Sequence, residues 1–286
     1  MTALPIPRHR VRRPSEYLIA AICVAVIVIM LWPLVMSFLA SVKPSTEASN
    51  VPPHYLPQSL SLENYREVAT FHQGIWVYVF NSLSVAAMTI VMCLALAIPA
   101  GYGLARFPIP GKEVWFLLIL ASMMIPYQAL LVPLYLMFSK LGLTGSQFGL
   151  AILHTVLQLP FSVYLMRNSF EGIPKEMEEA AVMDGASSFF TLRRVFVPLV
   201  APGMVTVALF AFVASWNEFL GALIMMNTES SFTVPIMLTG VITGNFGSVN
   251  WGALQASVII SILPCLLVYV LLQKYYVSGF LSGAVK

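Results

Sequence analysis

The chain has 286 residues, of which 59% are hydrophobic and only 9% are charged, and its formal net charge is +3 at neutral pH. Because soluble domains carry roughly 25% charged residues, this composition excludes an ordinary globule whose surface faces water. It indicates an integral membrane protein, whose outer surface faces lipid.

Six apolar stretches are each long enough to cross a membrane, which takes about 20 mostly apolar residues in a helix. Because backbone groups in lipid need hydrogen-bond partners within the protein, these stretches are expected to be helices. The sequence therefore predicts an all-α integral membrane fold with six transmembrane helices, in which prolines such as Pro126 produce kinks. The predicted spans are residues 17–42, 76–105, 114–139, 147–166, 197–226 and 254–273.

The basic residues predict the orientation of the chain, because Lys and Arg are enriched in cytoplasmic segments. Twelve of the 15 Lys and Arg residues fall in the N-terminal tail, in the loops after the second and fourth spans, or at the C-terminal end. Both termini are therefore expected in the cytoplasm. The predicted organisation is a cytoplasmic N-terminal tail (1–16), one transmembrane domain (17–276) and a cytoplasmic C-terminal tail (277–286).

The first span is expected to be retained, since it is longer than the roughly 7–15-residue core of a signal peptide and no A-x-A site follows it. Two longer loops are expected on the outer side, residues 43–71 and 227–253. Within the second of these loops, Pro235 to Leu238 are apolar enough to dip back toward the membrane.

The cysteines and histidines predict neither a disulfide nor a metal site. Cys23, Cys93 and Cys265 each lie in an apolar stretch and are expected to be small buried side chains. The four histidines are scattered, with no two at i, i+4. His154 lies inside a predicted span, where a hydrogen bond to another helix is favoured over metal binding.

The cytoplasmic loop at residues 171–198 is predicted to contain two short helices separated by a glycine turn. Pro174 suits the first turn of a helix, and acidic residues follow it where the helix dipole favours negative charge. Gly185 stands where a left-handed residue would end this helix. A second helix is expected over Ser187–Phe196, with its phenylalanines toward an apolar neighbour, before Pro198 opens the fifth span. Taken alone, the pattern also fits an amphipathic linker on the membrane surface.

This loop resembles the EAA motif of permeases in binding-protein-dependent ABC importers, whose pattern is EAA-x3-G-x9-I-x-L-P. We call residues 171–198 the EAA loop. Nearly the whole chain is similar to the carbohydrate-uptake branch of these permeases, and in particular to the smaller permease of maltose-type systems. The residues that match the motif are Glu179, Ala180, Ala181, Gly185 and Pro198, with Val195 and Val197 in place of isoleucine and leucine, and those similar to the carbohydrate branch include Asp184, Ala186, Asn81–Ser82 and Trp216–Phe219.

In that family the loop docks into an ATPase subunit, so the resemblance implies an ATPase-coupling role for Glu179, Ala180, Ala181, Asp184, Gly185 and Pro198. It also implies a bacterial inner-membrane location, with a second homologous permease, an ATPase dimer, an extracytoplasmic solute-binding protein and membrane lipid as partners, and no nucleic acid. The chain lacks a G-x-x-x-x-G-K-[ST] phosphate loop. It is therefore expected to be a transport subunit rather than an enzyme and to bind no cofactor, with ATP and Mg on the partner ATPase.

Glu218 is the only acid well inside an apolar run, and ionisable groups within a membrane face a cavity or a partner. With Trp216 and Asn217 it is a candidate for the substrate pathway, because aromatic rings and polar side chains commonly hold sugars. Hydrogen bonding between helices, or contact with the binding protein, explains these residues equally well. At most two of the three can line one cavity from a helix. Weaker candidates for the pathway are Asn81, Tyr127 and Gln128.

The predicted function is a permease that forms half of the pathway of an ATP-driven importer for a sugar or oligosaccharide. A permease for glycerol phosphate or another non-sugar solute is the nearest alternative, because such systems share these motifs. A secondary transporter is less favoured, since it would more often show two similar halves and charges for ion coupling. A membrane enzyme would need a catalytic motif such as H-E-x-x-H or G-x-S-x-G, and the sequence has neither.

Overall fold

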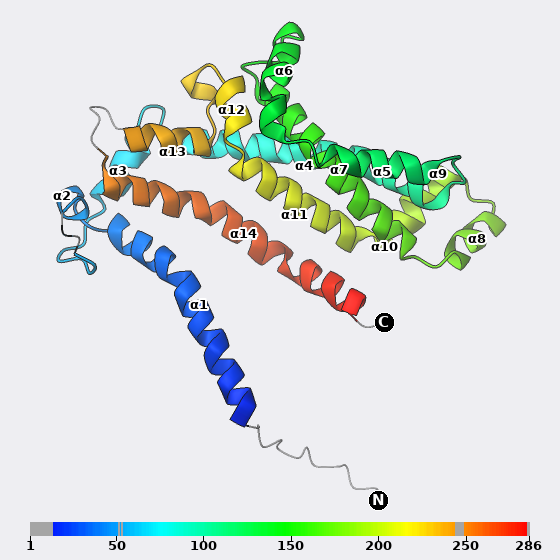
Figure 1. The fold of residues 1–286 in the computed structure, drawn as a ribbon, viewed down its shortest axis with the longest axis horizontal. Helices are drawn as coiled ribbons and strands as arrows, with labels where there is room; N and C mark the ends of the chain where they lie inside the picture. Colours follow the sequence, from blue (N-terminus) through cyan, green and yellow to red (C-terminus); the bar gives the residue numbers. More distant parts are fainter. Residues whose placement is uncertain (1–13, 51, 53, 244–248, 285–286) are drawn as a thin grey trace, which may run out of the picture.

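The computed structural model describes residues 14–50, 52, 54–243 and 249–284, and this part of the chain is helical, without strands. Figure 1 shows α4, α7, α11 and α14 running side by side as the main bundle, with α1 leading away from it. The elements are α1 (Pro14–Ser41), α2 (Ser45–Ala48), α3 (Glu63–Thr70), α4 (Ile75–Arg106), α5 (Lys112–Ser122), α6 (Tyr127–Lys140), α7 (Gln147–Glu171), α8 (Glu176–Met183), α9 (Ser188–Thr191), the π turn η1 (Leu192–Phe196), α10 (Val197–Leu199), α11 (Ala201–Asn217), α12 (Leu220–Met225), the 3-10 turn η2 (Glu229–Ser231), α13 (Val234–Thr243) and α14 (Trp251–Ala284).

The described chain has four helices that are long and apolar enough to cross a membrane, and they lie in α1, α4, α7 and α14. Two further apolar segments are pairs of helices bent by 94° and 76° at short breaks. Residues 14–284, as far as they are described, therefore contain between four and six candidate spans, depending on whether each bent pair crosses as one unit. The prediction of an all-helical membrane architecture is confirmed.

The third predicted span, 114–139, is not one kinked helix. The structure has α5 ending at Ser122 and α6 beginning at Tyr127, at 94° to α5. Pro126 immediately precedes α6 with φ −64° and ψ 115°, and a proline also disfavours a helical conformation of the residue before it. The predicted kink is therefore a turn between two separate helices.

The fifth predicted span, 197–226, is broken at two points. The helical segment that ends at Leu199 meets α11 at 76°. α11 then ends at Asn217, because Glu218 takes an extended conformation with φ −70° and ψ 124° before α12 begins. Glu218 thus lies at a break between two helices rather than inside one.

The structure describes the two predicted tails only in part. α14 continues beyond residue 273 to Ala284, so the segment predicted as a C-terminal tail is helical as far as it is described. Of the predicted N-terminal tail, only residues 14–16 are described, and they begin α1. The apolar stretch predicted to dip toward the membrane forms α13, with Ile236 and Met237 buried.

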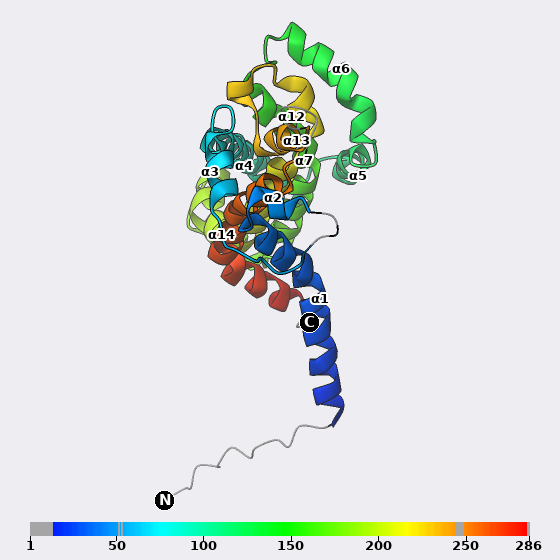
Figure 2. The same ribbon diagram turned by 90° about the vertical axis from the view of Figure 1, so that its left-hand side faces the viewer.

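The EAA loop lies at one end of the main bundle, and α2, α3 and α13 lie at the other (Figure 1). α6 stands away from the bundle, which the turned view in Figure 2 also shows. Large apolar side chains on α1 and α6 are exposed, as Ile29 and Val132 illustrate at 71% and 66%. These helices therefore present surfaces that the described part of the chain does not cover.

The main bundle is held together by a close approach of α4 to α7 at Gly101. A Cβ atom at this position would lie 2.7 Å from Met166 Cβ and 2.8 Å from the backbone nitrogen of Arg167. Small residues of this kind let helix backbones approach within a membrane. Gly103, on the same helix, has open space to 4 Å around the place where a Cβ would lie, and so serves as a matched control.

We expect Gly101→Ala to lower the free energy of unfolding by about 2 kcal/mol, because α4 and α7 must move apart to admit the methyl group. Gly103→Ala should leave stability unchanged or raise it by up to about 1 kcal/mol, since alanine favours the helix. Thermal unfolding of the two variants in one detergent measures the difference. Equal stabilities would contradict the close packing at Gly101.

Candidate functional site

The first helix of the EAA loop, α8, is built and ended by local interactions. Glu176, Glu178 and Glu179 lie in its first turn, where they complement the helix dipole. Gly185 ends it with φ +78°, and the amide of Ala186 donates to the carbonyl of Ala181 at 3.0 Å. This is the left-handed glycine cap that the sequence predicts.

The second helix of the EAA loop begins at Ser188, where the Ser187 hydroxyl accepts a hydrogen bond from the Phe190 amide at 3.3 Å. Of its predicted apolar face, Phe196 is fully buried, whereas Phe189 and Phe190 are 71% and 53% exposed. On α8, Met183 is 87% exposed. An apolar patch of this kind, displayed on a loop, marks an interaction surface.

The six predicted ATPase-coupling residues share an exposed or half-exposed position on this loop. The structure brings five of them together on α8 and its C-terminal turn, and the sixth lies apart on α10. These residues are Glu179, Ala180, Ala181, Asp184 and Gly185 on α8 and its turn, and Pro198 on α10.

Arg106, the last residue of α4, joins the base of the EAA loop to the bundle. Its Nη2 donates to the carbonyl oxygens of Phe170 and Ile173, at the end of α7, both at 2.5 Å. Its Nη1 lies 3.7 Å from the carboxylate of Glu178 on α8, and the guanidinium stacks over the Phe196 ring at 5.0 Å. The Arg106 side chain is only 5% exposed, so these contacts replace water around a buried charge.

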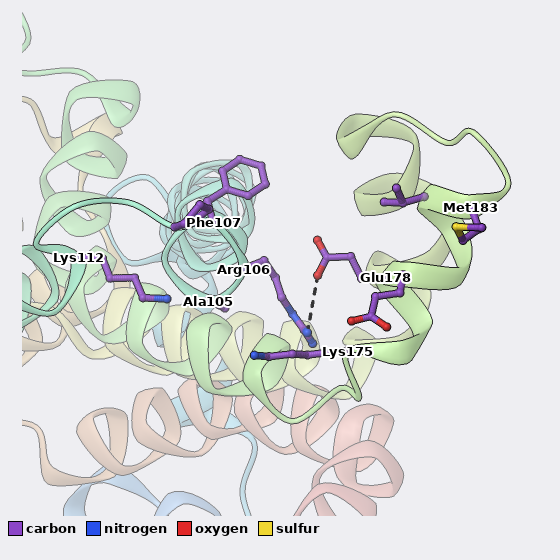
Figure 3. Close-up of a pocket in the computed structure, with 10 residues that line it drawn as sticks. Ala105, Arg106, Phe107, Lys112, Lys175, Glu178 and Met183 are labelled. Atoms are coloured by element: carbon purple, nitrogen blue, oxygen red, sulfur yellow. Dashed lines mark ion pairs between the residues drawn. The ribbon is translucent and has the colours of Figure 1, made fainter.

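A groove of about 750 Å³ separates the end of α4 from α8. Figure 3 shows Arg106 reaching across it toward Glu178, with Lys112 and Lys175 near its edge. Glu179 also lines the groove. The groove therefore combines basic and acidic side chains where a complementary element of another protein can enter.

A second cluster of charges joins α5 to α7. Arg167 on α7 donates to Glu113 at 2.7 and 2.9 Å and to Glu171 at 2.8 Å, and it lies 4.0 Å from the Phe116 ring centroid. In the sequence, Arg106 and Arg167 counted only as positive charges that set orientation. The i, i+4 spacing of Arg167 and Glu171 was the only local signal of this arrangement.

Glu218 is the centre of a hydrogen-bond network that spans the break after α11. Its carboxylate accepts bonds from the amides of Gly221 and Ala222 at 2.7 and 2.9 Å and from the Tyr127 hydroxyl at 2.8 Å. His154 Nε2 lies 3.1 Å from it. A carboxylate has enough acceptor sites to face all four groups without conflict.

His154 lies on α7 and bridges to the end of α11. Its Nδ1 lies 2.8 Å from Ser215 Oγ, while Nε2 faces Glu218. With Nε2 donating to the carboxylate, the neutral ring accepts from the serine hydroxyl. The prediction that His154 forms a hydrogen bond between helices is confirmed.

The other pathway candidates are not gathered around one cavity. Trp216 is 3% exposed and stacks on Phe212 at 5.6 Å, inside the core. Asn217 is exposed and donates back to Val213 of its own helix at 2.8 Å. Gln128 is exposed on α6, whereas the Asn81 side chain on α4 is 4% exposed.

Asn81 fastens α4 to the segment between α12 and α13. Its Nδ2 donates to the carbonyls of Ser230 and Phe232 at 2.8 and 2.9 Å, and its Oδ1 accepts from Gln147 at 2.6 Å. The adjacent Ser82 hydroxyl accepts from the Val234 amide at 2.9 Å. The Asn81–Ser82 pair therefore positions backbone in this structure.

We expect Glu218→Ala to lower the free energy of unfolding by about 2 kcal/mol, because it leaves buried donors without an acceptor. Asn217→Ala, the exposed neighbour, should change it by less than about 0.5 kcal/mol. Thermal unfolding in detergent measures both. An equal loss in the two variants would show that the network contributes nothing beyond local helix structure.

Comparison with known proteins identifies the family. The family model described as "Binding-protein-dependent transport system inner membrane component" matches residues 97–280. The diacetylchitobiose uptake system permease protein DasC of Streptomyces coelicolor is 31% identical, covering 90% of this chain and 92% of its own. The arabinooligosaccharides transport system permease protein AraQ of Halalkalibacterium halodurans is 30% identical, with the same coverage of the two chains.

A solved structure shares the fold. A chain of the bacterial ABC transporter that imports the acidic polysaccharide alginate superposes with a TM-score of 0.80 at 24% identity, covering 94% of this chain and all of that one. The overall helical fold of this chain is thus a known one. Because the family model covers more than half of its residues, the chain belongs to the binding-protein-dependent transport system inner membrane components and is the permease subunit of an ABC importer.

Proposed function

We propose that this permease forms half of the pathway by which an ATP-driven importer takes up a sugar or oligosaccharide. The chain crosses a bacterial inner membrane six times, with α5 and α6 counted as one span and α11 and α12 as another, and has both termini in the cytoplasm. The EAA loop then lies on the cytoplasmic side, where it couples to a separate ATPase. The chain binds no cofactor itself, and ATP and Mg belong to the partner ATPase.

The observation that carries the coupling proposal is the geometry of the EAA loop. A capped helix, a left-handed glycine turn and exposed Met183 and Phe189 form a protruding apolar surface beside a charged groove. A surface that combines an apolar centre with charged edges suits docking into a cleft of another protein. Arg106 and Glu178 connect this surface to α4, so movement of the loop is transmitted to the bundle.

The exposed apolar surfaces support two further partners. α1 and α6 display large apolar side chains that no part of the described chain covers. Lipid covers some of this surface, and a second homologous permease covers the rest and supplies the other half of the pathway. An extracytoplasmic solute-binding protein delivers substrate at the end of the bundle opposite the EAA loop.

The choice of a sugar rests on the relatives. Two permeases of about 30% identity over nine-tenths of this chain are named for diacetylchitobiose and for arabinooligosaccharides. Both names describe short saccharides, which are uncharged, polar molecules rich in hydroxyl groups. We therefore assign a saccharide to this importer.

The test is uptake by the complete complex. The tagged chain is purified from native membranes with its partners and placed in proteoliposomes that contain ATP. Uptake of labelled maltose, diacetylchitobiose, arabinobiose and glycerol 3-phosphate is then compared with uptake in vesicles that contain ADP.

ATP-dependent uptake of a saccharide is the expected result. ATP-dependent uptake of glycerol 3-phosphate and of no saccharide would show that the substrate is a non-sugar solute. Recovery of the chain without an ATPase, together with uptake driven by an ion gradient, would overturn the importer mechanism.

A further inference from the structure

A hollow of about 500 Å³ lies at the end of the bundle opposite the EAA loop. The turn between α3 and α4, the start of α4 and the segment from α12 to α13 form its walls. Rings line it on several sides, together with one carboxylate. These residues are Phe71, His72, Tyr78 and Phe232, with Glu229. The volume is within the range of about 300–1,000 Å³ typical of small-molecule sites.

His72 is held in an unusual conformation beside this hollow. It has φ +50°, and it is the only residue other than glycine with positive φ in the described chain. Such a conformation is uncommon, although histidine adopts it more readily than most residues. Its Nδ1 lies 2.5 Å from the Glu229 carboxylate, and both side chains are 41% exposed. The strained turn therefore presents an imidazole and a carboxylate together at an accessible edge.

The opposite wall is fixed in place by Asn81. Its two hydrogen bonds go to the carbonyl of Ser230, which follows Glu229, and to the carbonyl of Phe232, which carries the half-buried ring. Ser82 holds the next turn through the Val234 amide. A wall held in this way loses little conformational entropy when a ligand binds.

The chemistry of the lining favours a neutral, hydroxyl-rich ligand. Phe71 and Phe232 are half-buried, while Tyr78 is 1% exposed and forms the floor. The negative face of an aromatic ring attracts the C–H groups on the apolar face of a sugar. Hydrogen bonds from sugar hydroxyls to a carboxylate are charge-assisted and strong. Glu229 Oε1 lies against His72 Nδ1, so the hollow offers the carboxylate and the imidazole together to the hydroxyl groups of a ligand.

We propose that this hollow is a saccharide-binding site on the permease itself. One sugar ring stacks against Phe232, and its hydroxyls bond to Glu229 and His72. The site lies on the side that receives substrate, apart from the Glu218 network and from the EAA loop. The inference rests on the proposed function for its choice of ligand and for this orientation.

Direct binding to the full chain tests the site without the ATPase or the binding protein. The chain is placed in lipid nanodiscs, and saturation-transfer NMR is recorded with maltose, cellobiose and diacetylchitobiose, and with choline as a cationic probe. Glu229→Gln keeps the shape of the side chain but removes its charge, and Phe232→Leu keeps apolar volume but removes the ring. Glu63→Gln is the matched control, since Glu63 is an exposed carboxylate on α3 outside the hollow.

We expect saturation transfer to at least one of the three saccharides, about tenfold weaker binding in Glu229→Gln and Phe232→Leu, and no change in Glu63→Gln. Transfer to none of them, transfer to choline alone, or equal binding by all variants would overturn the site. If the chain binds no saccharide but the complex shows ATP-dependent sugar uptake, this site alone is overturned. Absence of sugar uptake by the complex would instead overturn the proposed function.

Discussion

Replacing Gly185 with valine is expected to lower ATP-driven uptake about tenfold while ATP hydrolysis by the partner ATPase continues. Gly185 has φ +78°, and this conformation costs a residue with a Cβ about 1–2 kcal/mol, close to a factor of ten in population. A Cβ at this position has open space within 4 Å. The change therefore acts on the backbone of the turn, and so on the angle between α8 and α9. The ratio of sugar transported to ATP hydrolysed in proteoliposomes measures the loss of coupling.

Two matched variants isolate the backbone effect. Gly172→Ala lies in the same loop, at φ −70° and with only ordinary contacts of 3.6 Å to its Cβ, and should keep normal coupling. Gly185→Asn should restore much of the uptake lost in Gly185→Val, because asparagine tolerates the left-handed conformation. A normal ratio in Gly185→Val would remove the turn from the coupling mechanism.

Charge reversal at Glu179 tests the docking surface by a different route. Glu179→Lys should uncouple uptake from hydrolysis to a similar degree, because Glu179 lines the groove between α8 and α4. Glu176→Lys is the control, since Glu176 lies in the same helical turn but outside the lining of the groove. Both changes weaken the match to the helix dipole, so only the groove contact distinguishes them. Equal coupling in the two variants would contradict a role for Glu179 at the interface.

Much of the EAA loop was predictable because its structure is local. The acidic first turn of α8 and the left-handed Gly185 follow from propensities that act over a few residues. The four continuous spans were equally predictable, since apolar length alone identifies them. For these elements, the physical cause lies within the segment itself.

The bent helix pairs were not predictable from apolar length, because a straight span and a bent pair have the same composition. Pro126 marked a break, but the 94° angle depends on what α6 packs against. The break at Glu218 has the same origin. Its stabilising partners Tyr127 and His154 are 91 and 64 residues away in the sequence. Trp216 was a candidate sugar contact for its residue type alone, and its stacking on Phe212 became visible only in the fold.

Arg106 is the clearest case of a residue whose role could not be inferred from the sequence. In the sequence it is one more positive charge after a span, and positive charge there is explained by orientation. Its partners lie at the end of α7, on α8 and in η1, between 64 and 90 residues further along. In the folded chain, this residue, which the sequence explains by orientation alone, makes the contact that joins the EAA loop to α4.

We expect Arg106→Ala to reduce the free energy of unfolding by about 3 kcal/mol, because it removes two charged hydrogen bonds to the carbonyls of Phe170 and Ile173. It should also lower the ratio of transport to hydrolysis, because α8 loses its ion pair with α4. Arg106→Lys should lose less stability and less coupling than Arg106→Ala but should not reach the values of the unchanged protein, since an ammonium lacks the planar fork of donors of a guanidinium. Thermal unfolding and the proteoliposome ratio measure the two effects separately.

Two control variants separate the structural and the transmitting roles of Arg106. Glu178→Gln removes the ion pair to α8 but leaves both carbonyl bonds, so it should preserve most of the stability and lower coupling. Lys140→Ala removes an exposed positive charge at the end of α6, outside the groove, and should change neither measurement. If Arg106→Ala loses stability and Glu178→Gln couples normally, Arg106 acts only as a cap for α7. Loss of coupling in Glu178→Gln without loss of stability would instead identify the ion pair as the link through which the EAA loop moves α4.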